Sequence, residues 1–141
     1  MARIKITLPA KHIFETELVL RISDINYGGH LANDAVLSIA HEARIRFLRK
    51  SGYTEQDIEG LGIIMTDAAI VYKTQGYYGD RLTVKISVDD FTRLGFDIYY
   101  QIINQDEKEI ARVKTNLTFF DYKANKIATV PQGFIEKINA I

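Results

Sequence analysis

The sequence predicts an α+β domain in which one long helix packs against an antiparallel sheet, and three observations carry this prediction. A segment with strand-like alternation opens the pattern at residues 12–22. A segment with helical periodicity follows at residues 33–50, and four more strand-like segments come after it. The 141 residues show no repeat or linker and only two prolines, so we expect a single domain over residues 1–141.

The first strand is expected at residues 12–22, because apolar side chains and threonine alternate there with charged ones. Its inward-facing side is predicted to hold Phe14, Thr16, Leu18, Leu20 and Ile22. The strand runs into Asp24 to His30, where an acid, an amide, two glycines and an imidazole follow one another. These residue types are typical of a turn, and they also bring several functional groups into a short loop.

The long helix is expected at residues 33–50. Its apolar stripe is formed by Val36, Ala40, Ala43 and Phe47. Asn33 is predicted to cap the helix at its N-terminus, and Ser51-Gly52 to end it. The first half carries no charge between residues 35 and 40, whereas the second half is rich in charge, so we expect the helix to enter a core first and to emerge into solvent later.

Two further segments follow the long helix. Residues 54–57 resemble the capping box of a short helix that Gly60 would end. Residues 63–73 are apolar on both sides except for Thr66 and Asp67. A strand that is apolar on both sides is typical of a sheet interior, and we expect this one there.

The remaining segments complete the sheet. Residues 81–91 alternate cleanly between apolar and polar side chains. Strands at 96–103 and 110–120 are expected to form a hairpin through a polar turn at 104–108. An apolar tail around Phe134 is predicted to pack as a short last helix. The order of strand, long helix and four strands therefore predicts an antiparallel sheet with the helix against its concave face.

Composition excludes several classes of function. Basic and acidic residues are equal in number, 18 of each, and the pI is near 6.8, so the chain offers no basic footprint for nucleic acid. It has no cysteine, which excludes disulfides and thiol nucleophiles. No apolar stretch resembles a signal peptide or reaches the ~20 residues of a membrane span. We therefore expect a cytoplasmic protein without membrane or nucleic-acid partners.

Metal-dependent chemistry is not predicted either. The three histidines, His12, His30 and His41, lack the spacing of a zinc site, because Ile45 stands where H-E-x-x-H requires its second histidine. The chain has no P-loop, no G-x-G-x-x-G and no G-x-S-x-G motif. We therefore expect neither a metal nor a cofactor.

The loop before the long helix is the place where chemistry is expected. Two glycines allow a ligand to approach the backbone, and the amide N–H groups at a helix start can hold a developing negative charge. The sequence thus predicts an oxyanion hole formed by Gly29, His30, Leu31 and Asn33. A simpler interpretation stays open: Asp24 and Asn26 satisfy the turn backbone, and Asn33 only caps the helix.

The run Arg21-Ile22-Ser23-Asp24-Ile25-Asn26-Tyr27-Gly28-Gly29-His30-Leu31-Ala32-Asn33, followed by His41-Glu42-Ala43-Arg44, resembles the hotdog-fold acyl-CoA thioesterases of the 4-hydroxybenzoyl-CoA thioesterase type. Residues 75–84 and Val130-Pro131 extend the resemblance. It implies a five-stranded antiparallel sheet wrapped around one central helix. It also implies hydrolysis of an acyl-CoA or acyl-carrier-protein thioester without metal, with coenzyme A as part of the substrate. The same resemblance implies a homodimer or dimer of dimers (a homotetramer), with sheets joined edge to edge and active sites at the subunit interface.

The chain departs from this family at one position. The family's catalytic carboxylate falls on Asn26, and an amide cannot take a proton from water. Asp24, Asn26, His30 and Asp67 are the expected catalytic set, in which Asp24 is the first candidate for a replacement base and Asp67 the second. Glu42 is expected to pair with Arg46 one turn later, and His41 to be a half-buried helix residue.

Two other functions remain open. The chain can be a domain that binds acyl thioesters without cleaving them, and Asn26 favours this alternative. It can also be a dehydratase or hydratase, in which His30 would face Asp67 or Glu42 across a dimer.

Overall fold

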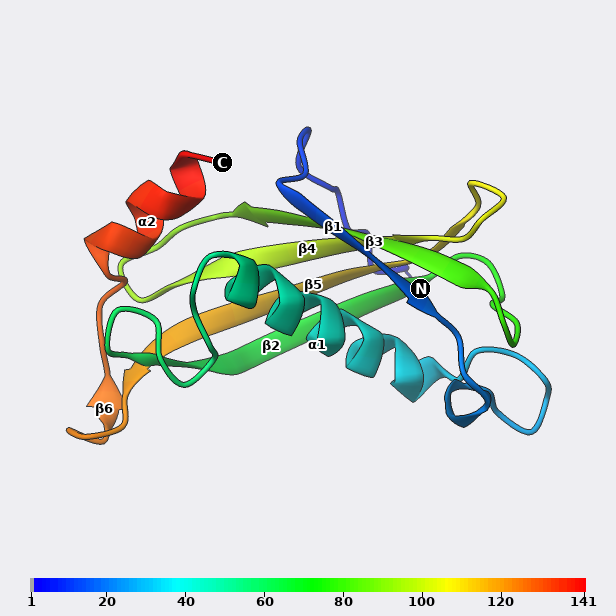
Figure 1. The fold of residues 1–141 in the computed structure, drawn as a ribbon, viewed down its shortest axis with the longest axis horizontal. Coiled ribbons are helices and arrows are strands. Elements are labelled where there is room, and N and C mark those ends of the chain that lie inside the picture. Colours follow the sequence, from blue (N-terminus) through cyan, green and yellow to red (C-terminus); the bar gives the residue numbers. More distant parts are fainter. Residues whose placement is uncertain (1) are drawn as a thin grey trace.

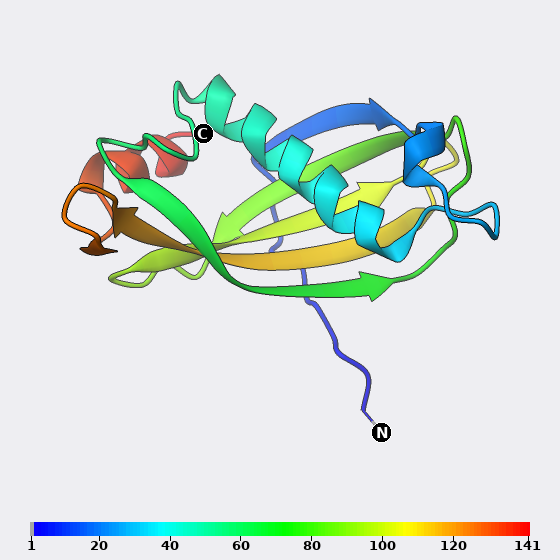
Figure 2. The ribbon, with the colours of Figure 1, turned by 90° about the horizontal axis from the view of Figure 1, so that it is seen from below.

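The computed structural model describes residues 2–141, which form one antiparallel sheet and two α-helices (Figure 1). In chain order the elements are β1 (Phe14–Val19), a 3-10 turn (Ile22–Asp24), α1 (Asn33–Lys50), β2 (Gly62–Tyr72), β3 (Arg81–Asp89), β4 (Gly95–Ile103), β5 (Glu109–Asp121), β6 (Lys126–Ile127) and α2 (Gln132–Asn139). The strands are ordered β1-β3-β4-β5-β2, and the short β6 pairs with β5. The predicted fold, five antiparallel strands around a long helix, is confirmed, and Figure 2 shows the sheet curving around α1.

The first strand is shorter than predicted. It ends at Val19, and the chain turns into the 3-10 segment, so the alternation stops after Leu20. Ile22 was expected on the inner side but is 72% exposed. The prediction for Ile22 is therefore wrong, because side chains in a 3-10 turn do not repeat every two residues.

Helix α1 has the predicted bounds but a different cap. Its N-cap is Ala32, and Asn33 is the first helical residue without a capping side-chain bond. The predicted role of Asn33 as N-cap is thus wrong, whereas Ser51 is the C-cap as expected. The second half of the helix emerges into solvent only in part: Arg44 and Phe47 are buried, Phe47 against Phe14 of β1, whereas Arg49 and Lys50 at its end are exposed.

The connection between α1 and β2 contains no helix. The hydroxyl oxygen of Thr54 accepts the amide N–H of Asp57, as in a capping box, but the chain turns at Glu59 and Gly60 with positive φ. Ile58 is fully buried and bridges to Leu61. The predicted short helix is therefore wrong, since burial of Ile58 draws this segment into a turn against the core.

Strand β2 lies at an edge of the sheet and not in its interior, which corrects the expectation for residues 63–73. It pairs with β5 only, and its central side chains are exposed. Met65, for example, is 44% exposed. The apolar residues on both sides of β2 thus do not mean that it is an interior strand of the sheet in this protomer.

The other predictions for the sheet and tail are confirmed. The β4–β5 hairpin turns at residues 104–108, and α2 buries Phe134 and Ile138. Phe134 packs among Phe91, Phe96 and Phe119. None of the helices in residues 2–141 is long and apolar enough to cross a membrane.

Candidate functional site

Asp24 organises the beginning of the loop between β1 and α1. Its Oδ2 atom accepts the amide N–H of Arg21 at 2.8 Å and lies 3.9 Å from Arg21 Nε. Within residues 2–141, its second carboxylate oxygen has no hydrogen-bond partner. Asp24 therefore closes the 3-10 turn with one oxygen and leaves the other available.

Asn26 holds the next turn together. Its side-chain oxygen accepts hydrogen bonds from the backbone N–H groups of Gly28 at 2.9 Å and of His30 at 3.3 Å. The backbone N–H of Asn26 donates to the His30 carbonyl at 2.8 Å. Gly29 has φ +84° in this turn, a conformation that favours glycine. The Asn26 side chain thus acts as a scaffold for the loop, as the simpler interpretation of the sequence expected.

The amide groups that were predicted to form the oxyanion hole are already used. Gly29 donates to the Asn26 carbonyl at 3.0 Å, and His30 donates to the Asn26 side chain. Leu31 donates to the carbonyl of Gly76 at 2.8 Å, and Ala32 to that of Asp24 at 2.9 Å. The backbone of Gly29, His30 and Leu31 is therefore not free to hold an oxyanion, which corrects that part of the expectation.

Two amides at the start of α1 remain available. The N–H groups of Asn33 and Asp34 have no acceptor within residues 2–141, whereas Ala35 donates to the Ala32 carbonyl. They stand at the positive end of the dipole of an 18-residue helix, where N–H groups lack helical partners. Of the amides at this end of the loop, those of Asn33 and Asp34 are therefore the ones free to bind a ligand, and the role predicted for Asn33 in holding an anion stays a prediction.

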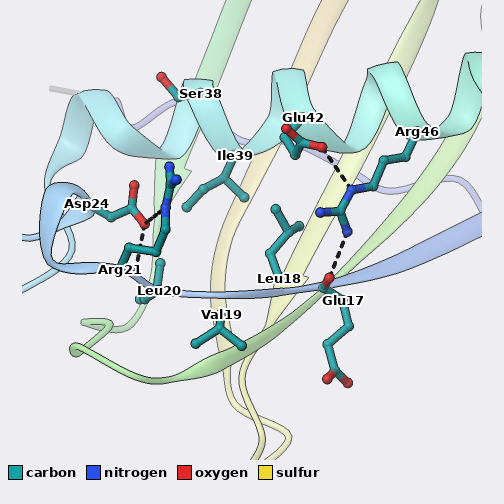
Figure 3. A pocket seen from close by; sticks show the side chains of 10 residues that line it. All are labelled: Glu17, Leu18, Val19, Leu20, Arg21, Asp24, Ser38, Ile39, Glu42 and Arg46. Carbon is teal, nitrogen blue, oxygen red and sulfur yellow. Dashed lines mark hydrogen bonds and ion pairs between the residues drawn. The ribbon is translucent and has the colours of Figure 1, made fainter.

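Three clefts surround α1. The largest, of about 450 Å³, lies between β1 and α1, and Figure 3 shows Asp24, Ser38 and Glu42 at its walls. Glu42 is bound to Arg46 at 2.9 Å, as predicted from their spacing. A pocket of about 160 Å³ adjoins Asn33. A third cleft, of about 240 Å³, runs along the opposite flank of the helix, from Asp34 to Arg44.

Asp67 does not join the loop. A one-residue bulge at Thr66 places Asp67 opposite Asn116, and Asn116 is opposite Asp97. These side chains lie on the outer face of the sheet, away from α1, because residues that pair directly share a face. Asp67 binds Lys114 Nζ at 2.8 Å there and is 57% exposed. Within one protomer the structure therefore separates Asp67 from the other predicted site residues.

His30 lies beside the loop but makes no catalytic pair in residues 2–141. Its ring packs edge-on against Tyr77, with centroids 5.5 Å apart. Neither Glu42 nor Asp67 is bonded to it. This arrangement provides no His30–carboxylate pair of the kind that the dehydratase alternative needs within one copy.

The sequence did not predict a polar network that starts at His41. His41 Nε2 lies 2.9 Å from Glu55 Oε1, and Arg44 Nε donates to Glu55 Oε2 at 2.7 Å. Arg44 then donates to the buried hydroxyl of Tyr100, which is 3.0 Å from that of Thr115. The sequence held one signal of this network. Arg44 lies on the apolar side of the helix, and a charged side chain that is buried there needs a hydrogen-bonding partner.

Over the described part of the chain, residues 2–141, no group of three or more His, Cys, Asp or Glu side chains is placed to hold a metal ion.

Comparison with known proteins places this geometry in a family. A profile of the thioesterase-like superfamily matches residues 20–138. A protein of Aquifex aeolicus (strain VF5) with the name "Putative esterase" is 30% identical over 97 residues, which cover 67% of this chain and 73% of that protein.

Two solved structures share the fold. A 1,4-dihydroxy-2-naphthoyl-CoA thioesterase from Synechocystis aligns with a TM-score of 0.82 at 22% identity, covering 91% of this chain and 96% of that one. A Staphylococcus aureus protein in complex with CoA aligns with a TM-score of 0.83 at 14% identity, covering 95% and 86%. The profile match over most of the chain, together with this hotdog architecture, shows that the chain belongs to the thioesterase-like superfamily.

Proposed function

We propose that this protein is an acyl-CoA thioesterase, which hydrolyses an acyl thioester to a free acid and coenzyme A without a metal. The observation that carries the proposal is the pair of unsatisfied amides, Asn33 and Asp34, at the start of α1. The backbone amides of the preceding loop are engaged in hydrogen bonds within the loop and, from Leu31, to Gly76, so the loop holds the Asn33 and Asp34 amides in a fixed place. Family membership and the CoA complex of a structural relative support a CoA thioester as the ligand.

The reaction needs an oxyanion site and a proton acceptor. The amides of Asn33 and Asp34 would hold the thioester oxygen as it gains negative charge, and they need no rearrangement because the helix already orients them. Asn26 cannot accept the proton, so a different group must. The candidates that we consider lie on the flanks of α1, and they are the available oxygen of Asp24 and the imidazole of His41.

The active form is proposed to be a homodimer that pairs the β2 edges of two copies. The exposed apolar side chains Met65 and Tyr72 on β2 support this arrangement, as does the absence of a second pairing strand for β2 within residues 2–141. Pairing would continue the sheet from one copy into the next. It would also bring the Asp34–Arg44 flank of one α1 toward that of the other.

The test of this function is release of free thiol from a panel of acyl-CoA substrates with aliphatic and aromatic acyl groups. Acyl-carrier-protein thioesters belong in the same panel. Turnover of at least one substrate well above the uncatalysed rate is expected. If calorimetry shows tight binding of acyl-CoA while no substrate releases thiol, the protein is a thioester-binding domain and the enzyme proposal is wrong.

A further inference from the structure

His41 and Glu55 form a histidine–carboxylate pair whose geometry specifies the imidazole tautomer. His41 Nε2 is 2.9 Å from Glu55 Oε1. An ionised carboxylate only accepts hydrogen bonds, so in the neutral ring Nε2 carries the hydrogen and Nδ1 has the lone pair. Within residues 2–141, Nδ1 has no hydrogen-bond partner. The ring is thus oriented by Glu55 and has an unused proton-accepting atom.

Glu55 is held ionised by its surroundings. Partial burial acts to raise its pKa, but the hydrogen bonds from Arg44 and His41 outweigh burial and bring the pKa below its ordinary value. Arg44 is itself only 6% exposed and is anchored by the hydroxyl of Tyr100. Three charged groups face His41. Glu55 is bonded to its ring, Arg44 is bonded to Glu55, and Asp34 lines the other end of the same cleft.

The pair lies beside a cleft that reaches the proposed oxyanion site. The cleft of about 240 Å³ is lined by Asp34, Ser38 and His41 on α1 and by Met65 on β2. Asn33 and His41 are eight residues apart, or ~12 Å along the helix axis at 1.5 Å per residue. One carbonyl group cannot touch both the Asn33 amide and His41 of the same copy.

Two-fold pairing of the β2 edges removes this separation. Antiparallel pairing of the two β2 edges, like the antiparallel pairing of the strands within the sheet, places the two-fold axis perpendicular to the strands, so the two α1 helices run antiparallel. The middle of one helix, where His41 lies, then faces toward the N-terminal half of the other. A carbonyl held by the amides of one copy is thereby placed toward the imidazole of the second copy.

We propose that His41 is the general base of thioester hydrolysis and acts on a carbonyl held by the Asn33 and Asp34 amides of the second copy. Glu55 and Arg44 are positioning residues. This inference rests on the proposed function and the proposed dimer, and it deepens both by supplying the proton acceptor that Asn26 cannot be.

The step balances without a further reagent. His41 Nδ1 takes a proton from a water molecule, and the water oxygen forms a bond to the carbonyl carbon. The oxygen of the tetrahedral intermediate is held by the two amides. The carbon–sulfur bond then breaks, and the leaving thiolate takes the proton from the imidazolium. The products are the carboxylic acid and coenzyme A.

The first experiment measures kcat and KM for His41→Gln on the best substrate of the panel. Glutamine keeps an N–H donor for Glu55, so the thermal midpoint should stay within a few degrees. We expect kcat to fall ~10²–10⁴-fold with KM nearly unchanged, the range for loss of a general base. His12→Gln is the matched control, because His12 also pairs with a glutamate, Glu15 at 3.0 Å, and neither residue lines the cleft beside His41.

Glu55→Gln tests the positioning role. It should lower kcat with little change in KM and shift the acid limb of the pH profile of kcat/KM, a result that a purely structural residue would not give. Asp24→Asn is the competing variant. If Asp24→Asn abolishes turnover while His41→Gln keeps the wild-type kcat, the base is Asp24 and the inference is wrong.

A mixed-dimer experiment tests which copy supplies His41. His41→Gln chains and Asn33→Pro chains are each expected to be inactive alone. When the two are co-refolded in equal amounts, each mixed dimer has one intact site, so about a quarter of the wild-type activity should return. No recovery in a mixture that is shown to contain mixed dimers contradicts action between copies.

These outcomes separate the inference from the proposed function. If wild type hydrolyses thioesters and His41→Gln does so equally well, the function stands and the inference falls. If wild type releases no thiol from any substrate, the proposed function falls and takes this role of His41 with it.

Discussion

Arg44 Nη1 donates a hydrogen bond of 2.9 Å to the hydroxyl oxygen of Tyr100, and both side chains are buried between α1 and β4. The guanidinium thereby joins the helix to the sheet and, through Glu55, to the loop that follows the helix. Its two hydrogen-bond partners, the Glu55 carboxylate and the Tyr100 hydroxyl, both accept from the guanidinium. Removing that side chain would leave Glu55 Oε2 and the Tyr100 hydroxyl oxygen without the hydrogen bonds that Arg44 donates, although His41 would still donate to Glu55 Oε1.

Arg44→Met is therefore expected to lower the free energy of unfolding by about 1.5–3 kcal/mol, the range for losing hydrogen bonds to a charged group, because Arg44 is buried but Glu55 is only partly so. Arg49→Met, on the exposed side of the same helix, should change it by no more than about 0.5 kcal/mol. Urea denaturation followed by circular dichroism measures both. Equal stability of the two variants would show that the Arg44 network does not hold the fold.

The lowered pKa of Glu55 predicts a pH dependence of stability. The unfolded chain binds the Glu55 proton more tightly than the folded chain, so the contribution is complete above the ordinary pKa of 4.5 and is lost as pH falls through the lower folded value. Partial burial acts to raise the pKa of Glu109, but hydrogen bonds from Arg112 and Gln101 outweigh it and lower this pKa. Glu109 therefore also loses its contribution to stability as the pH falls. The free energy of unfolding should thus decrease below about pH 4.5, and less steeply in Glu55→Gln. Parallel curves for Glu55→Gln and wild type would refute the Glu55 part.

Asn33→Pro removes one free amide without removing a helical hydrogen bond. Proline is favoured at the first position of a helix, and the preceding residue, Ala32, is extended as proline requires. We expect a ~10²-fold lower kcat with an unchanged thermal midpoint, the typical loss for one oxyanion donor. Asn33→Ala keeps the amide and is the control. Similar kcat values for the two variants would exclude the Asn33 amide from catalysis.

Asn26→Asp separates an enzyme from a binding domain. A carboxylate can accept the Gly28 and His30 amides as the side-chain oxygen of Asn26 does, so the loop should keep its conformation. If the protein is the proposed enzyme, we expect kcat to stay the same or fall, because the proton acceptor lies elsewhere. Thiol release that appears only in Asn26→Asp would identify the natural protein as a binder.

Met65→Arg is expected to convert the dimer to a monomer. Met65 is exposed on the β2 edge, so the change should affect folding of the single chain little, but two arginines would face each other across a paired edge. Light scattering after size-exclusion chromatography gives the mass. Val19→Arg places the same charge on the opposite edge strand, β1, and should leave the dimer intact. A dimer that survives Met65→Arg would exclude the β2 interface.

The local sequence pattern was sufficient to predict a helix or a turn where residues close in the chain determine its structure. The periodicity of residues 33–50 predicted α1 with its correct bounds, and the polar run at 104–108 predicted the β4–β5 turn. The residues from Arg21 to Asn33 also pointed to the right family. These features depend on residues close in the chain, whose side chains and backbone act on one another directly.

The predictions were wrong where residues distant in the chain determine the position or the hydrogen bonding of a segment. Strand β2 is at an edge because of the strand order, which its own composition does not contain. Asp67 lies on the outer face because of a bulge at Thr66, which shifts the alternation by one residue. The amide of Leu31 is satisfied by Gly76, 45 positions further along the chain.

The sequence by itself thus determined which segments form helix and strands, and which loop has functional groups. Only the tertiary structure decided which of those groups are free to act: it used the amides of Gly29 to Leu31 within the chain, left those of Asn33 and Asp34 available, and brought Glu55 to His41. The physical reason is that hydrogen bonds in a folded chain are satisfied over the whole molecule, while periodicity reports only on neighbours along the chain.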